Sequence, residues 1–93
     1  MLADTLVIDN AAAHRFELVE AGLTAFADYV RQPGRLVIPH VEAPIALRGT
    51  GAAGRLMEGV VAHVQAEGVR IVPICAYAAA WLRRHPEHSD LVE

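Results

Sequence analysis

The first half of the chain alternates apolar and polar residues with the two-residue period that is typical of half-buried strands. Residues 15–20 place Phe16 and Leu18 on one face of such a strand. Ala21-Gly22 then indicates a hairpin turn, after which the same period continues over residues 23–31. These two segments therefore predict an antiparallel pair of strands.

Two further strands are predicted on either side of this pair. A short apolar run over residues 6–8 is closed by Asp9-Asn10, which predicts a strand that ends in a turn. Residues 36–42 form another strand-like run, which Pro39 interrupts. Because proline cannot donate a ladder hydrogen bond, we expect a bulge or an unpaired edge at this position.

The hydrophobic period changes in the second half of the chain. Apolar residues recur at steps of three and four over residues 53–67, which predicts a helix with one apolar face, and Gly68 is placed to end it. Residues 69–75 are predicted to form a strand. Residues 76–84 are predicted to form a short helix that stops before Pro86.

This order of elements predicts an α+β fold with a mixed, mainly antiparallel sheet. The strands at 36–42 and 69–75 are joined through a helix, so they should pair in parallel by a right-handed crossover. With 93 residues and 54% hydrophobic content, we expect one domain over residues 1–93 with a single packed core.

Composition and charge narrow the classes of function. The net charge is −3 and no basic cluster is present, which disfavours nucleic acid as a partner. Cys75 is the only cysteine, which excludes an internal disulfide and a cysteine-rich metal site and fits a reducing compartment. No signal-peptide pattern is present, and no apolar stretch approaches the roughly 20 residues of a membrane span. We therefore expect a cytoplasmic protein that does not bind membranes.

A glycine-containing turn, Arg48-Gly49-Thr50-Gly51-Ala52-Ala53, separates the strand at 36–42 from the long helix. Glycines allow a tight turn and a close approach of a ligand to the main chain, and the free N–H groups at a helix start attract anions. The pattern favours a nucleotide-like cofactor held through its phosphates. The alternative is an ordinary helix start after a glycine-rich loop.

At this strand-to-helix junction, Arg48, Gly51 and Ala53 match the Arg/Gln-x-x-Gly-x-Gly/Ala signature of the GNAT acetyltransferases. The chain resembles, over nearly its whole length, the very small, single-domain GNAT-like group. The segments that carry this resemblance are His40-Val41-Glu42, Arg48-Gly49-Thr50-Gly51, Pro73-Ile74-Cys75, Arg84-His85-Pro86-Glu87 and Asp90-Leu91-Val92.

The resemblance implies an acetyl-CoA site. In that family the CoA pyrophosphate lies on amides at the start of the long helix, and pantetheine runs beside the preceding strand. Arg48 is expected to pair with a CoA phosphate, whereas Arg55 either does the same or lies on a solvated helix face. The implied cofactor-binding residues are Val41, Ala43, Arg48, Gly49, Thr50, Gly51, Ala52, Ala53 and Gly54.

Direct acetyl transfer requires an unprotonated amine, donors for the developing oxyanion and a proton source for the leaving CoA thiolate. Amides around Val41 are the candidate donors. Glu42 or His40 is the candidate base, directly or through water, and each is alternatively a surface residue of its strand. Cys75 is expected beside the thioester, where it could act as an acid, as an acetyl carrier or only as pocket lining.

The chain departs from the small GNAT-like pattern at Ala76-Tyr77, where proline and then an aromatic are favoured after the cysteine, and at Trp81. Trp81 stands where that group tends to have tyrosine, and an indole cannot serve as a general acid. Tyr77 is the remaining candidate, although packing against the core or the cofactor is the favoured role. His85, Glu87 and His88 do not form a complete ligand set, so no metal is expected.

We therefore predict an acetyl-CoA-dependent N-acetyltransferase whose acceptor is a small amine or a peptide or protein lysine. Residues 9–14 leave room only for a turn where larger GNAT enzymes carry acceptor-site helices. The acceptor side should thus be open or completed by a partner. The alternative is a noncatalytic acyl-CoA-binding or protein-interaction module, and the sequence leaves the acceptor and the oligomeric state open.

Overall fold

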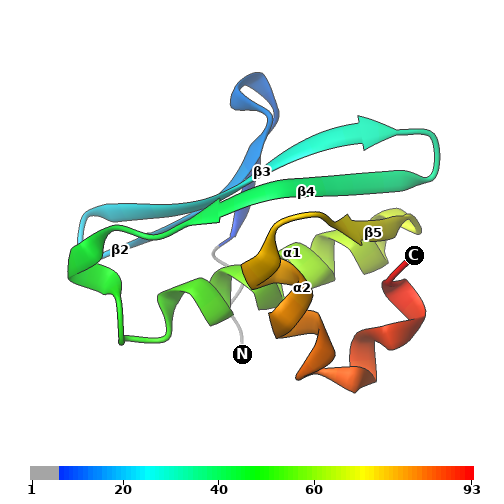
Figure 1. Cartoon of the computed structure of the whole chain (residues 1–93). Coiled ribbons are helices and arrows are strands. Elements are labelled where there is room, and N and C mark those ends of the chain that lie inside the picture. The colour runs from blue at the N-terminus through cyan, green and yellow to red at the C-terminus, as the bar shows by residue number, and fades with distance from the viewer. Residues whose placement is uncertain (1–6) are drawn as a thin grey trace.

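A computed structural model describes residues 7–93, which form a five-stranded sheet with helices on one of its faces (Figure 1). The strands follow one another across the sheet in chain order, and all neighbours are antiparallel except the last pair. This confirms the predicted α+β fold and the parallel pairing. The strands are β1 (Ile8–Asn10), β2 (Arg15–Glu20), β3 (Leu23–Gln32), β4 (Arg35–Glu42) and β5 (Arg70–Pro73).

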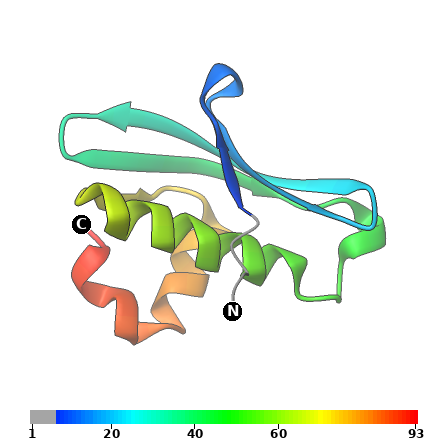
Figure 2. The same ribbon diagram turned by 180° about the vertical axis from the view of Figure 1, so that it is seen from behind.

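Residues 7–93 contain two α-helices and three short 3-10 turns. They are α1 (Ala52–Glu67), α2 (Ala76–Arg83) and the 3-10 turns η1 (Ala11–Ala13), η2 (Ile45–Leu47) and η3 (Pro86–Leu91). Seen from front and back, α1, α2 and η3 occupy the same side, and no α-helix of residues 7–93 covers the opposite side (Figures 1 and 2). Ile8, Val19 and Val30 are accordingly more than half exposed on that open face.

The first strand differs from the sequence expectation. We expected a strand over residues 6–8 that ends in a turn at Asp9-Asn10, but Asp9 and Asn10 belong to β1 and pair with Phe16 and Arg15. The turn comes next, as η1, and the Asn10 side chain caps it by accepting a backbone N–H at 3.2 Å. The asparagine therefore marks the turn that follows it. Residue 6 lies outside the described residues.

The last strand is shorter than the expected 69–75. Its pairing with β4 ends at Pro73, and Cys75 is the N-cap residue of α2 rather than a strand residue. The Ile74 and Cys75 N–H groups both donate to the Ile38 carbonyl, at 3.1 and 3.0 Å. Because both bonds end on one β4 carbonyl, the ladder cannot advance along β4, and the chain leaves the sheet at this point.

The core lies between the sheet and α1, as the two periodicities predicted. Phe16 and Leu18 of β2 and Leu36 and Ile38 of β4 are buried on the helix-covered face. α1 ends at Gly68, which adopts the left-handed conformation (φ 71°) and donates to carbonyls of the last turn. The buried apolar residues that α1 contributes are Leu56, Met57, Val60, Val61 and Val64.

Pro39 lies in a bulge of β4, as expected from the sequence. Ile38 and Pro39 together oppose a single residue of β3, Tyr29. An extra residue of this kind is left out of the ladder, so the N–H that proline lacks is not required there.

The bulge changes the direction in which the following backbone groups point. Ile38 directs its carbonyl towards β5, and successive strand residues point their backbone groups to alternate sides. Without an extra residue, His40 would also face β5. Instead His40 pairs with Asp28 of β3, so the N–H and carbonyl of Val41 point into the gap beyond the end of β5.

Gly59 sets how closely α1 approaches the start of β1. A Cβ atom at this position would overlap Cβ and Cγ2 of Val7, which is itself buried. We expect overpacking in Gly59→Ala to lower the free energy of unfolding by about 1–3 kcal/mol. The higher helix propensity of alanine offsets up to ~1 kcal/mol of this loss. Thermal and urea unfolding measure the difference.

Gly54→Ala is the matched control, because a Cβ there would lie 3.5 Å from Nε1 of Trp81, an ordinary contact. It should leave stability unchanged or raise it, since it gains the same helix propensity without the overlap. Equal unfolding midpoints for the two variants would contradict the close approach at Gly59.

Candidate functional site

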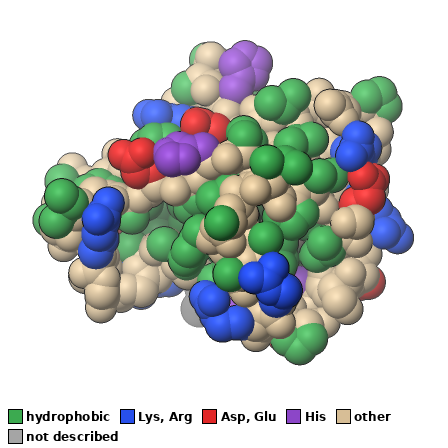
Figure 3. Space-filling model, in the orientation of Figure 1, with side chains coloured by type: hydrophobic (Ala, Val, Ile, Leu, Met, Phe, Trp, Pro, Cys, Tyr) green, Lys and Arg blue, Asp and Glu red, His purple; other side chains and the backbone are tan. Residues whose placement is uncertain are grey.

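Two adjoining cavities lie where β4 ends beside the start of α1, with volumes of about 450 and about 260 Å³. We call them together the β4–α1 cleft. They share Ala43, Arg48, Ala53 and Tyr77 as lining residues. The rest of the lining consists of His40, Val41 and Glu42 in the larger cavity and Leu47, Gly49, Gly51, Ala52 and Gly54 in the smaller one. The surface is visibly hollowed on the face shown in Figure 3.

All but one of the cofactor-binding residues expected from the sequence line this cleft. The exception is Thr50, whose hydroxyl donates to the Leu47 carbonyl at 2.5 Å and accepts the Ala52 N–H at 3.3 Å. Thr50 therefore shapes the turn from outside the cleft. Leu47 also lines the cleft and is buried, but the sequence reasoning did not include it. The available signal was an apolar residue directly before Arg48.

The turn before α1 needs glycine at its last position. Gly51 is the N-cap residue of α1 with φ 88°, in the left-handed region that other residues rarely adopt. A Cβ atom there would also come within 3.0 Å of Nη1 of Arg55. Gly51 thus lets the chain enter α1 directly from the turn.

Backbone N–H groups gather at this turn. Within residues 7–93, the N–H groups of Gly49 and Gly51 have no protein acceptor, and those of Ala53 and Gly54 belong to the first helical turn, which has no partners of its own. The first turn of α1 also contains no acidic residue. These donors, together with the helix dipole, form a site that favours an anion.

The two arginines near the turn have different surroundings. Arg48 is exposed, lines both cavities and forms no ion pair with another described residue. Arg55 instead donates two hydrogen bonds to Glu20, each 2.7 Å long, from Nε and Nη2. This pairing holds the pKa of Glu20 below its ordinary value. Arg48 is therefore the cation available to a ligand, whereas Arg55 anchors α1 to the β2–β3 hairpin.

His40 and Glu42 lie beside each other where the end of β4 forms the rim of the larger cavity. Their side chains are about half exposed, at 51% and 54%, and Nε2 of His40 is 2.9 Å from Oε1 of Glu42. Both alternate with Val41, which is half buried and faces the cleft interior. The pair of candidate bases thus shares the rim with the Val41 N–H.

Cys75 and Tyr77 approach the cleft from α2. Cys75 is half buried and packs against the core, but its side chain lines neither cavity. Tyr77 lines both, and its burial raises the pKa of its phenol, with the Arg84 cation opposing that shift. The phenol is therefore protonated at neutral pH and can donate a hydrogen bond into the cleft.

Trp81 and the histidines after it form a stack of rings behind the first turn of α1, where Nε1 of Trp81 would lie 3.5 Å from a Cβ atom on Gly54. The Trp81 and His85 rings are 3.7 Å apart between centroids, and His88 is a further parallel ring at 6.0 Å from Trp81. In the described part of the chain, no group of three or more histidine, cysteine or carboxylate side chains could hold a metal ion. Likewise, no helix within residues 7–93 is both long and apolar enough to cross a bilayer.

Comparison with known sequences decides the family. The model of the GCN5-related N-acetyl-transferase family matches residues 15–91, which include the whole β4–α1 cleft. The chain belongs to this family. No curated protein matches the sequence.

A solved structure agrees with this fold. The solution structure of a GCN5-like candidate N-acetyltransferase from Staphylococcus aureus superposes with a TM-score of 0.68. The match covers 99% of this chain and 91% of that chain at 17% sequence identity. At this identity the likeness supports the GNAT fold alone.

Proposed function

We propose that this GNAT-family chain is an acetyl-CoA-dependent N-acetyltransferase that transfers the acetyl group directly to an amine. The observation that carries the proposal is that the unpartnered amides before α1 and the Val41 N–H, which the bulge turns away from β3, border the two adjoining cavities of one cleft. The first set suits a pyrophosphate, and the second suits the carbonyl oxygen of a thioester.

The residues of the turn fit the cofactor. The amides of Gly49, Gly51, Ala53 and Gly54 would hold the pyrophosphate, and Arg48 would add a charge-assisted hydrogen bond. Each neutral amide contributes only about 0.5–1.5 kcal/mol net, so several are needed. Bound acetyl-CoA supplies the activated acetyl group as its thioester.

Ala53→Asp separates cofactor binding from folding. A carboxylate in the first turn of α1 favours the helix through its dipole but repels a pyrophosphate at the same amides. We expect acetyl-CoA affinity to fall roughly tenfold or more while the unfolding midpoint stays equal or rises. Isothermal calorimetry and thermal unfolding measure the two effects, and Ala53→Ser is the uncharged control.

If Ala53→Asp binds acetyl-CoA as tightly as the parent, the anion does not lie on these amides. Arg48→Gln gives a second reading of the same site, with Arg70→Gln as its control. Arg70 is exposed, and its Nη1 contacts only the Val92 carbonyl, at 3.4 Å, far along β5 from the cleft.

In the proposed transfer step, the amine nitrogen attacks the thioester carbonyl carbon. A C–N bond forms, the C–S bond breaks, and its electron pair leaves with sulfur. In this proposal the Val41 N–H stabilises the developing oxyanion, and Glu42 accepts the amine proton directly or through water. The Tyr77 phenol, whose residue lines both cavities, is the proposed proton donor to the CoA thiolate.

Glu42 rather than His40 is the proposed base, because a carboxylate can also attract the cationic form of the acceptor before it accepts the proton. Glu42→Gln should lower kcat/KM at neutral pH by about 100-fold or more, with recovery at higher pH as the amine deprotonates on its own. His40→Gln should cost less. Steady-state assays across pH measure both, and parental rates for Glu42→Gln with normal cofactor binding would show that Glu42 is not the base.

Cys75 has the alternative of accepting the acetyl group itself. The 93-residue sequence contains no lysine, so an acetyl adduct found by intact-mass spectrometry and peptide mapping is not confused with lysine acetylation. Because the Cys75 side chain does not line the cleft, we expect no kinetically competent adduct, and we expect Cys75→Ser and Cys75→Ala to retain most activity. An adduct that forms and decays at the rate of turnover would reverse this expectation.

The acceptor proposed from the sequence is a small amine or a peptide or protein lysine. Release of CoA thiol that depends on an added amine supports transfer, whereas tight acetyl-CoA binding without such release supports the noncatalytic module. Polyamines, amino acids and lysine peptides are the panel to screen. The cytoplasmic location expected from the sequence stays a prediction.

A further inference from the structure

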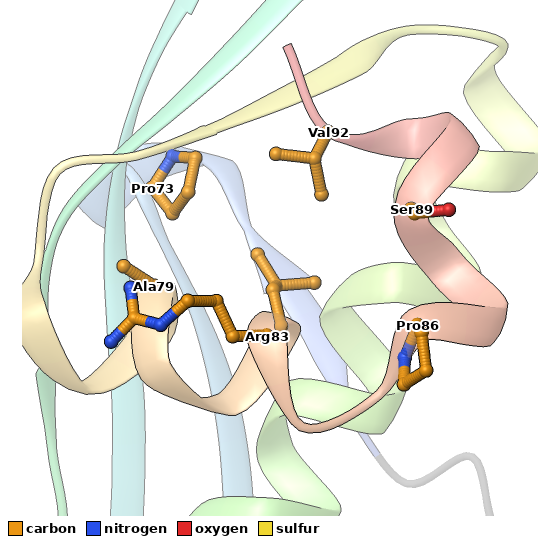
Figure 4. Close-up of a pocket in the computed structure, with 7 residues that line it drawn as sticks. Pro73, Ala79, Arg83, Pro86, Ser89 and Val92 are labelled. Carbon is orange, nitrogen blue, oxygen red and sulfur yellow. The ribbon is translucent and has the colours of Figure 1, made fainter.

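A third cavity, separate from the β4–α1 cleft, lies on the other side of β5. Its volume is about 450 Å³, and it is an open pocket bordered by the end of β5, by α2 and by η3 (Figure 4). We call it the β5–η3 cavity. Its lining residues are Pro73, Ala79, Leu82, Arg83, Pro86, Ser89 and Val92. None of them lines the cleft, so this cavity requires its own explanation.

The cavity is apolar with a single cationic group. Figure 4 shows the Arg83 guanidinium beside Ala79 at the edge below Pro73, while the Ser89 hydroxyl points away from the space between them. Arg83 is exposed and forms no ion pair with another described residue. An apolar wall with one unneutralised guanidinium is complementary to an apolar molecule that carries a carboxylate.

The edge of β5 adds a hydrogen-bond acceptor. The Arg70 and Ile74 N–H groups bond to carbonyls of β4, so the residues between them alternate in direction. Ile71 accordingly faces outward, and its carbonyl accepts the Glu93 N–H at 3.0 Å. By the same alternation the Pro73 carbonyl faces outward, on the edge of β5 where Pro73 lines the cavity, and no turn or loop N–H of residues 7–93 donates to it.

From these three features we propose that the β5–η3 cavity binds a free N-acylated apolar amino acid. The apolar side chain fills the cavity, the α-carboxylate pairs with Arg83, and the amide N–H donates to the Pro73 carbonyl. A volume of about 450 Å³ lies within the range for small-molecule sites. The proposal does not depend on the transferase reaction, because it uses none of the residues of the β4–α1 cleft.

Two probes that differ only in charge test the site: N-acetyl-L-leucine and N-acetyl-L-leucinamide. Titrations of the ¹⁵N-labelled chain followed by NMR should shift the amides of Ala79, Leu82, Arg83 and Val92 with the acid. N-acetyl-L-leucinamide, the uncharged probe, should bind about tenfold more weakly, as expected for the loss of one charge-assisted hydrogen bond.

Variants on neighbouring arginines locate the carboxylate. Arg83→Gln should remove the preference for the acid, and Arg84→Gln, the adjacent exposed arginine that does not line the cavity, should keep it. Both residues are at the exposed end of α2, so neither change should unfold the chain, which the NMR spectra verify. The proposal is overturned if the two probes bind equally, if shifts cluster at residues of the β4–α1 cleft, or if both variants lose the preference alike.

Discussion

The Ile38 carbonyl accepts two hydrogen bonds, and the layout of the molecule depends on them. The Ile74 and Cys75 N–H groups both end on this oxygen, at 3.1 and 3.0 Å. The pair closes the parallel ladder between β4 and β5 and sends the chain into α2. One residue later, the bulge at Pro39 changes the side of the strand to which the following N–H and C=O groups of β4 point. The gap between the two strands therefore results from a shared acceptor followed by an extra residue.

Much of this arrangement could be predicted from sequence because it depends on periodicity and on glycine. The apolar steps from Leu56 to Val64 fixed the buried face of α1, and Pro39 marked the bulge. The turn at Asp9-Asn10 was misplaced because a capping asparagine can belong to a strand end as readily as to the turn after it. Cys75 was expected in a strand, since no local pattern reveals that two N–H groups compete for one distant carbonyl.

The candidate site divides in the same way. The glycine turn predicted most of the cleft lining, whereas the different surroundings of Arg48 and Arg55 could not be predicted. Arg55 pairs with Glu20, which is 35 residues away in the chain and reaches α1 only because the β2–β3 hairpin folds over it. Tyr77 lines the cleft because α2 begins where β5 ends, and the position of that end depends on contacts between residues distant in the sequence.

The cleft is formed largely by main-chain groups, and this has a consequence for how the family varies. A peptide N–H is present whichever side chain its residue carries, so the donors depend on the bulge and on the two left-handed glycines of the turn, Gly49 and Gly51. Most side chains around them are then free to change over evolutionary time. The Staphylococcus aureus protein keeps the same fold with 17% identical residues. Backbone geometry, rather than residue identity, is therefore the trait by which distant members of such a family can be compared.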